Sequence, residues 1–321
     1  MADANGSTVN AFVFQNAIRV ELDWVAFTKL AVVILITLCS VYVNCVMLYA
    51  LNSKRVFRES SRYILFAHML FNDSVHLLLS FVLFFLAVIF LKLAKSVCSV
   101  ILFLSTATFA NAPLNLAVMS LECYVAICFP LRHAEIATQK RTFIAISFMW
   151  VIGPVNVLCD IFTAAVLDKT FFYVQMFCAR EQLFIQPWQL DVFNGFNAFL
   201  FASVTLIIVF TYISIVITAR SMSSNKDSAK KAQRTVLLHL IQLGLCTTSF
   251  MYGTIERALY IVIGSGSLFS HLRYLNFLFF LILPRCLSPV IYGLRDDAVR
   301  PLFKYYFCHC SRKLQTAVNV Q

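Results

Sequence analysis

The sequence predicts an all-α membrane protein, a bundle of seven transmembrane helices. Of its 321 residues, 60% are hydrophobic and only 13% are charged, and the mean hydropathy is +0.81, which is far more apolar than an ordinary soluble domain. The apolar residues come in runs of about 20 or more, the length a helix needs to cross the bilayer. Such continuous runs exclude a membrane barrel, whose strands would alternate apolar and polar residues.

Charged or turn-rich stretches divide the chain into the predicted spans. The seven spans are 27–51, 63–91, 97–124, 142–166, 192–219, 236–263 and 272–294. We therefore expect an N-terminal tail over 1–26, a helix bundle over 27–294, and a short amphipathic helix with a cytoplasmic tail over 295–321. We see no internal repeat and no appended catalytic domain.

The distribution of positive charge predicts the orientation of the bundle. The net charge is +11, and 17 of the 26 Lys and Arg residues fall in the first, third and fifth loops and the C-terminal segment, against 7 on the other side. Because cytoplasmic loops of membrane proteins are enriched in Lys and Arg, the N-terminus is expected outside and the C-terminus inside. This bias explains the net positive charge, so the lipid bilayer is the expected partner and no nucleic acid is expected.

Four segments carry motifs in a fixed order along the chain. They are Leu121 to Arg132 at the inner end of the third span, Lys231 to Leu240 at the start of the sixth, Met251 to Thr254 within the sixth, and Ser288 to Arg295 at the end of the seventh. Together with Asn44, Asp73 and Trp150, this ordered set resembles the odorant receptor family of rhodopsin-like (class A) G-protein-coupled receptors. Within that family it is most similar to the fish group called odorant receptor 131-2-like.

The resemblance implies a chemosensory receptor in the plasma membrane of sensory neuron cilia. It would bind a small odorant in the outer half of the bundle and activate a heterotrimeric, olfactory Gs-like G protein. The resemblance also pairs Cys98 with Cys178 in a disulfide that ties an outer loop to the third helix. The residues expected to contact the ligand are Ser105, Thr106 and Phe109 in the third span, Asn194 and Asn197 in the fifth, and Tyr252, Glu256 and Tyr260 in the sixth.

The inner half departs from the family pattern. Glu122, Cys123 and Tyr124 stand where the family has Asp-Arg-Tyr, so the arginine that would pair with the preceding acid is missing. Arg132 and the basic inner loops are candidate partners for Glu122. Ser288 replaces the family's Asn before Pro289. Besides these positions, we expect Tyr212, Pro289 and Tyr292 to take part in switching or coupling.

Charges inside the spans are functional candidates because burying them in lipid is costly. Asp73 lies mid-span in the second helix, where the resemblance implies a sodium or polar switch site. Arg285 lies near the middle of the seventh helix, and its guanidinium could neutralise Asp73 directly. The alternative is that Arg285 contacts backbone carbonyls or water.

Glu256 has two interpretations. Helical spacing places it on one stripe with Tyr252 and Tyr260, where a free carboxylate would suit a cationic amine. The other interpretation is an interhelical salt bridge near Arg257 that leaves the pocket close to neutral. Asp160 and Asp191 could add negative charge to the pocket mouth, or be solvated.

Other residue patterns are expected to be structural or to carry modifications. His68, His76 and His239 share no ligand spacing and should form hydrogen bonds between helices. Cys308 and Cys310 flank a histidine but make an incomplete zinc site, so palmitoylation is favoured. Asn5 begins a glycosylation sequon. No metal or cofactor is expected.

The function classes that compete with an odorant receptor are few. No phosphate-binding loop, paired-His metal site or nucleophile elbow appears, so an enzyme is not expected. The seventh span has no Lys for a retinal Schiff base, which argues against an opsin. The remaining alternatives are a non-olfactory rhodopsin-like receptor for a small amine or other metabolite and, in a different class, a channel or transporter.

Overall fold

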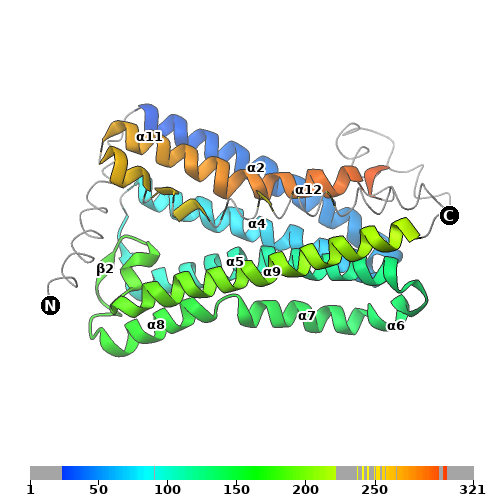
Figure 1. Ribbon diagram of the computed structural model, residues 1–321. Helices are drawn as coiled ribbons and strands as arrows, with labels where there is room; N and C mark the ends of the chain where they lie inside the picture. The colour runs from blue at the N-terminus through cyan, green and yellow to red at the C-terminus, as the bar shows by residue number, and fades with distance from the viewer. Residues whose placement is uncertain are drawn as a thin grey trace.

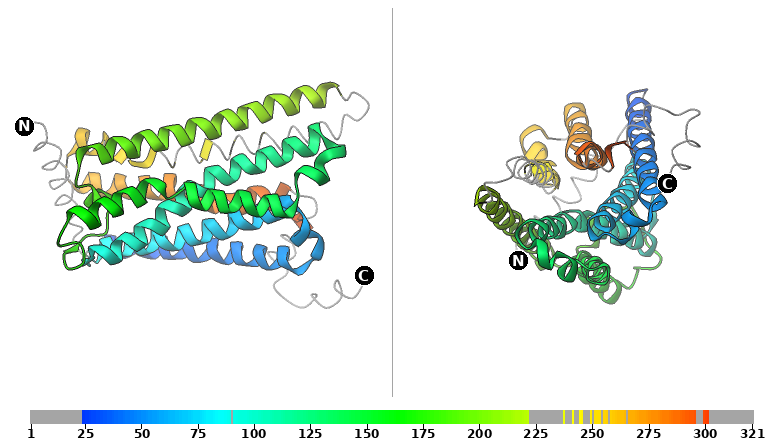
Figure 2. Two further views of the ribbon diagram at one scale, coloured as in Figure 1. Left: turned by 90° about the horizontal axis from the view of Figure 1, so that it is seen from below. Right: turned by 90° about the vertical axis from the view of Figure 1, so that its right-hand side faces the viewer.

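Long helices run side by side along one axis in the computed structural model (Figure 1). The structure describes residues 24–89, 91–221, 237, 241, 244–245, 249, 251–253, 255–256, 258–264, 266–295 and 299–301. Seen end-on, the helices lie beside one another as a bundle (Figure 2). This is the arrangement expected when apolar helices associate in lipid and turn their polar residues toward one another.

Six of the predicted spans appear as helices long and apolar enough to cross a membrane. They are α2 (Trp24–Ser53), α4 (Ser61–Val88), α5 (Lys95–Cys128), α7 (Gln139–Ile152) with α8 (Val155–Leu167), α9 (Pro187–Ser221), and α11 (Ser267–Asn276) with η3 (Phe277–Ile282) and α12 (Leu283–Arg295). In the sixth span, the described residues 251–253 and 258–263 are helical. The predicted all-α class is confirmed, although most helices extend beyond the predicted ends because they continue past their apolar run into polar residues.

Short elements mark the two ends of the bundle. The strands β1 (Leu93–Ala94) and β2 (Gln175–Met176) pair antiparallel at one end, next to η2 (Arg180–Leu183). We call this the disulfide end, after the bond described below. At the opposite end, which we call the far end, lie α3 (Arg55–Glu59), η1 (Pro130–Arg132) and α6 (His133–Ile136).

The fourth span is broken where a glycine meets a proline. Gly153 ends α7, and Pro154, which has no N–H to continue the helical ladder, precedes α8. A Cβ atom on Gly153 would lie only 2.9 Å from Asn111 Oδ1 and 3.3 Å from the Ala110 Cβ of α5. Only glycine therefore allows α5 to approach this bend so closely.

We expect Gly153→Ala to destabilise the protein by roughly 1–3 kcal/mol, because the added methyl group overpacks the contact with α5. The measurement is the thermal unfolding midpoint of the purified protein. Gly195→Ala in α9 is the matched control, since nothing lies within 4 Å of its added Cβ, and alanine favours helix at such a site. Equal midpoints for the two variants would contradict the close approach.

A π-helix and a proline interrupt the seventh span. Pro284 has no N–H for the carbonyl of Phe280, four residues earlier, so that α-helical hydrogen bond is absent. The Ser249 hydroxyl of the sixth span donates to the Phe280 carbonyl instead, at 2.6 Å. This bond satisfies the exposed carbonyl and connects the sixth and seventh helices at the bend.

Histidines connect the second helix to its neighbours, as the sequence predicts. The Trp150 indole of α7 donates to His68 Nε2 at 2.9 Å, so the ring proton is on Nδ1 and points to Asn115 Oδ1, 3.1 Å away. His76 lies 3.2 Å from the Thr108 hydroxyl of α5. His239 lies outside the described residues.

Candidate functional site

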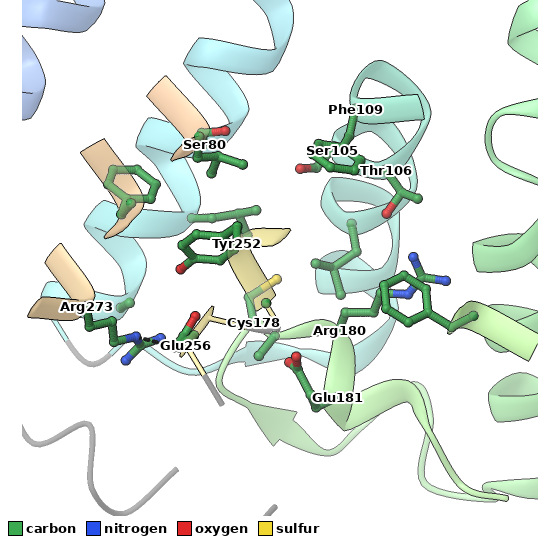
Figure 3. Close-up of a pocket in the computed structure, with 18 of the residues that line it drawn as sticks. Ser80, Ser105, Thr106, Phe109, Cys178, Arg180, Glu181, Tyr252, Glu256 and Arg273 are labelled. Atoms are coloured by element: carbon green, nitrogen blue, oxygen red, sulfur yellow. Dashed lines mark ion pairs between the residues drawn. The ribbon is translucent and has the colours of Figure 1, made fainter. Parts of the chain in front are cut away.

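A cavity of about 1640 Å³ lies among the helices toward the disulfide end. Helices α4, α5 and α9, the sixth span, α11 and the loop between α8 and α9 all contribute to its wall. Its lining includes every ligand-contact residue named from the sequence, which are Ser105, Thr106, Phe109, Asn194, Asn197, Tyr252, Glu256 and Tyr260 (Figure 3). Residues from three distant parts of the chain thus meet at one site.

A disulfide fixes the loop that covers the cavity. Cys98 near the start of α5 is bonded to Cys178, as predicted, and Cys98 is fully buried. The strand pair beside this bond aligns Leu93 with Met176. Cys178 and the residues on both sides of it line the cavity, so the bond holds the loop against the cavity mouth.

A buried ion pair holds the same loop at a second point. The Arg180 guanidinium donates to Asp160 Oδ2 of α8 at 2.7 Å and lies over the Phe193 ring of α9, 4.2 Å from its centroid. Gln189 Nε2 donates to the other oxygen of Asp160 at 3.0 Å. Burial lowers the pKa of Arg180, and the neighbouring Asp160 opposes that shift. Asp160 is therefore neither solvated nor a free negative group at the mouth, which corrects the sequence-based expectation, whereas Asp191 is exposed and lines the cavity.

A second ion pair holds the base of the loop. Lys95 Nζ lies 2.8 Å from Asp168 Oδ2, just after α8. Hydrogen bonds from Lys95 and Thr170 lower the pKa of Asp168 from 3.8 to about 2. Because the folded state favours the charged carboxylate, this pair stabilises the loop above about pH 4, and that contribution is lost as the pH falls toward 2.

Glu256 forms an interhelical salt bridge. Its carboxylate lies 2.5 Å from the Arg273 Nε of α11, and the two side chains are 9% and 28% exposed. Glu256 does share a cavity-lining face with Tyr252 and Tyr260, as the spacing predicts. The expectation of an unpaired carboxylate that would bind an amine is wrong, because Arg273, near the start of the predicted seventh span, lies within α11 and its guanidinium reaches Glu256. Arg257 lies outside the described residues.

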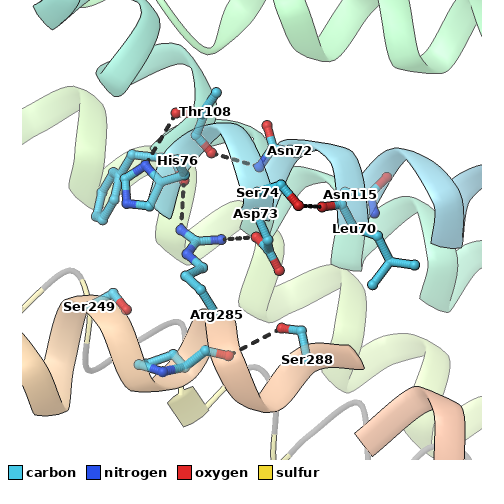
Figure 4. A network of polar contacts seen from close by, with 12 residues as sticks. Leu70, Asn72, Asp73, Ser74, His76, Thr108, Asn115, Ser249, Arg285 and Ser288 are labelled. Carbon is cyan, nitrogen blue, oxygen red and sulfur yellow. Dashed lines mark hydrogen bonds and ion pairs between the residues drawn. The ribbon is translucent and has the colours of Figure 1, made fainter. Parts of the chain in front are cut away.

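The predicted intramembrane ion pair is confirmed below the cavity. Arg285 of α12 donates to Asp73 Oδ1 of α4 at 3.0 Å, and the two residues are only 3% and 1% exposed (Figure 4). A second guanidinium nitrogen of Arg285 donates to the Phe109 carbonyl of α5 at 3.4 Å. The Phe109 side chain lines the cavity. One buried guanidinium therefore connects the second and seventh helices to the cavity floor.

Glu122 pairs with a histidine at the far end. Its carboxylate lies 3.1 Å from His133 Nε2 of α6. Arg132, a candidate partner named from the sequence, is exposed instead. It lies in η1, and the residue that follows it, His133, contacts Glu122 of α5. Tyr124 packs between the rings of Phe129 and Phe210, at 5.7 and 5.6 Å.

The remaining switch and modification residues are placed only in part. Tyr212 is half-buried in α9 and Pro289 is buried in α12. Tyr292 lies in α12, but its side chain is outside the described part of the structure. The glycosylation candidate Asn5 and the palmitoylation candidates Cys308 and Cys310 also lie outside the described residues, as does nearly all of the expected C-terminal amphipathic helix.

We expect His133→Ala to raise basal cAMP, because it removes the described partner of Glu122, which holds α5 to α6. Adding Cys123→Arg in the same chain places a fixed positive charge beside Glu122 and should return basal cAMP toward the parent value. Arg132→Ala is the matched control, since its exposed side chain has no such role. Unchanged basal cAMP in His133→Ala, at equal surface level, would contradict this assignment.

The sequence alone does not identify the polar partners that fix this site. Arg180 and Arg273 appear in it only as positive charges of the outer side, and Gln189 is not a candidate. A sequence signal for Arg273 is the pair of glycines at 264 and 266, which indicates a break before a new helix. In the structure Gly264 has a φ of +74° and α11 begins at Ser267, so Arg273 falls in its second turn.

Fold and site together define a multi-pass receptor, and comparisons with known proteins agree. The family described as "7 transmembrane receptor (rhodopsin family)" matches residues 24–292. The chain therefore belongs to the rhodopsin family of seven-transmembrane receptors, which is not an enzyme family.

Its relatives carry the names of chemosensory receptors. The chain is 34% identical over 290 residues to odorant receptor 131-2 of Danio rerio, covering 83% of this chain and 82% of that protein. It is 29% identical over 216 residues to human olfactory receptor 5AK3, with 61% and 66% covered. It is 31% identical over 216 residues to mouse olfactory receptor 5G26, with 60% and 62% covered.

Proposed function

We propose that this chain is an odorant receptor that binds a small molecule in the cavity and activates a heterotrimeric G protein. The observation that carries the proposal is a single cavity of about 1640 Å³, which is lined by all eight residues expected to contact a ligand and covered by a disulfide-tethered loop. The names of the relatives, odorant receptor and olfactory receptor, support the same function.

The proposed orientation places the disulfide end outside the cell and the far end in the cytoplasm. Basic residues gather at the far end, as the positive-inside rule requires of a cytoplasmic face. Those in the described residues are Lys54, Arg55, Arg58, Arg62, Arg132, Lys140, Arg141, Arg220, Arg295 and Arg300. A ligand would then enter from outside, and a Gs-like olfactory G protein would bind at the far end. The plasma membrane of sensory neuron cilia is the proposed location.

Ligand binding would act on the far end by shifting the population of two helix arrangements. The cavity floor contacts the Asp73–Arg285 pair through the Phe109 carbonyl. Below that pair, Pro289 bends the seventh helix, and Glu122 and His133 join α5 to α6. A ligand that displaces Phe109 or the sixth helix would therefore change the packing that holds the far end closed.

The experiment that tests this function is a ligand screen in non-sensory cells. Cells that express the receptor with an olfactory-type G protein are expected to raise cAMP in response to a subset of amines, amino acids, organic anions and neutral odorants. Cells with the G protein alone are the control. Ligand-evoked current without cAMP would instead indicate a channel, and no response from surface-delivered receptor would contradict the proposal.

A further inference from the structure

One ion pair differs from the others in its relation to the cavity. Among the described residues, Glu256 and Arg273 are the one ion pair whose two members both line the cavity. Asp73 and Asp160 do not line it, so the pairs formed by Arg285 and Arg180 turn at least one charge away from a ligand. A ligand in the cavity thus has access to one positive and one negative group at a single point.

The charge balance of this point restricts which ligands fit. A simple amine that bound Glu256 would compete with Arg273 for this carboxylate and leave the guanidinium with only the longer-range attraction of Glu181 in a poorly solvated site. A simple carboxylate would leave Glu256 in the same position, and unpaired charges in such sites are strongly disfavoured. A zwitterion supplies one charge of each sign, so it exchanges one ion pair for two and leaves no charge unpaired.

Neighbouring groups match the two ends of such a ligand. The Tyr252 hydroxyl points toward the Glu256–Arg273 pair, while Glu181 extends from the covering loop toward the cavity (Figure 3). The guanidinium and the phenol can donate to a carboxylate. The two carboxylates can accept from an ammonium.

The wall next to this polar point is apolar. Phe84 and Phe277 stack with their ring centroids 5.0 Å apart, and both line the cavity together with Leu83 and Leu102. An apolar substituent beside the two charges would remove this surface from water.

We propose that the cavity binds a small zwitterion of the α-amino-acid type with an apolar side chain. Its carboxylate pairs with Arg273 and Tyr252, its ammonium pairs with Glu256, and its side chain contacts Phe84 and Phe277. The inference rests on the proposed function, because it names the ligand class for the same cavity.

The test compares each amino acid with two analogues that each lack one charge. L-phenylalanine is compared with phenethylamine and 3-phenylpropanoate, and L-leucine with 3-methylbutylamine and 4-methylpentanoate. The readouts are cAMP in cells and the thermal stability of the purified full-length receptor, which does not depend on coupling. We expect at least one amino acid to be tenfold or more potent than both of its analogues.

Removing one partner at a time should change which charge is preferred. Arg273→Gln leaves Glu256 free and should make the amine the most potent of the three probes, whereas Glu256→Gln should favour the acid. The matched controls are Arg55→Gln and Glu59→Gln, which alter an exposed ion pair of the far end and should keep the parent order. Surface level is measured for every variant.

The outcomes separate this inference from the proposed function. If neutral odorants raise cAMP while neither amino acid changes cAMP or thermal stability, the zwitterion assignment is wrong and the proposed odorant receptor function is retained. If an amino acid acts but both Gln variants keep the parent order of potency, the binding site is not the Glu256–Arg273 pair. If no neutral odorant and no amino acid acts on surface-delivered receptor, both proposals fail.

Discussion

Cys98→Ala and Cys178→Ala are each expected to abolish surface delivery or the ligand response. The disulfide closes a loop of the chain over the cavity, and such a bond typically contributes about 2–4 kcal/mol to stability. Without it, the loop would still be held by the Asp160–Arg180 pair at 2.7 Å and the Lys95–Asp168 pair at 2.8 Å. Those contacts and the pairing of β1 with β2 hold the loop at other points, but none of them is covalent, so we expect the segment around Cys178 to open away from the cavity mouth.

Surface immunostaining and ligand-evoked cAMP measure this effect. Cys159→Ala is the matched control, because Cys159 is an exposed, unbonded cysteine of α8, and its loss should change neither readout. Normal surface delivery and normal ligand potency in Cys98→Ala would show that the covering loop does not need the bond.

The second large effect is expected at the buried pair of Asp73 and Arg285. Arg285→Met should reduce stability by about 3–5 kcal/mol, because it leaves the Asp73 carboxylate buried without its cation. Asp73→Asn leaves the guanidinium equally unpaired. The double variant Asp73→Asn with Arg285→Met removes both charges and should recover much of the stability lost by either single variant.

Thermal unfolding of the purified receptor gives this double-mutant cycle. The exposed pair Arg55 and Glu59 provides the comparison, since exposed pairs contribute about 0–1 kcal/mol and its cycle should show little coupling. Additive losses at Asp73 and Arg285 would contradict a strong ion pair. Ligand response is measured on the same variants, because the Arg285 bond to the Phe109 carbonyl predicts weakened signalling even where stability is recovered.

How far the sequence predicts this site depends on where each charge lies. The ion pair of Asp73 and Arg285 could be predicted from the sequence. Both residues fall in the middle of apolar spans, where an unpaired charge is costly and an opposite charge stabilises it. The eight residues expected to contact a ligand all line the cavity, and that expectation came from the family resemblance. The disulfide pairing came from the family resemblance.

Two other charge partnerships could not be predicted, for different physical reasons. Arg273 is the second residue of the predicted seventh span, so hydrophobicity places it among the charges at the outer end of that span and does not show that its side chain turns toward Glu256. Arg180 lies in a connecting loop, whose course is set by contacts such as those with Asp160 and Phe193 rather than by any periodicity. Hydrophobic patterns locate helices well, but long-range polar partners depend on three-dimensional contacts.

The most direct test of the account asks whether ligand occupies this cavity. Asn197 lines the cavity from α9, whereas Leu206, nine residues further along the same helix, is 70% exposed on the opposite face. With any agonist found in the screen, Asn197→Trp should place a bulky side chain in the cavity and weaken the cAMP response at normal surface level, while Leu206→Trp should keep the parent potency. Equal responses from the two variants would contradict ligand binding at this site.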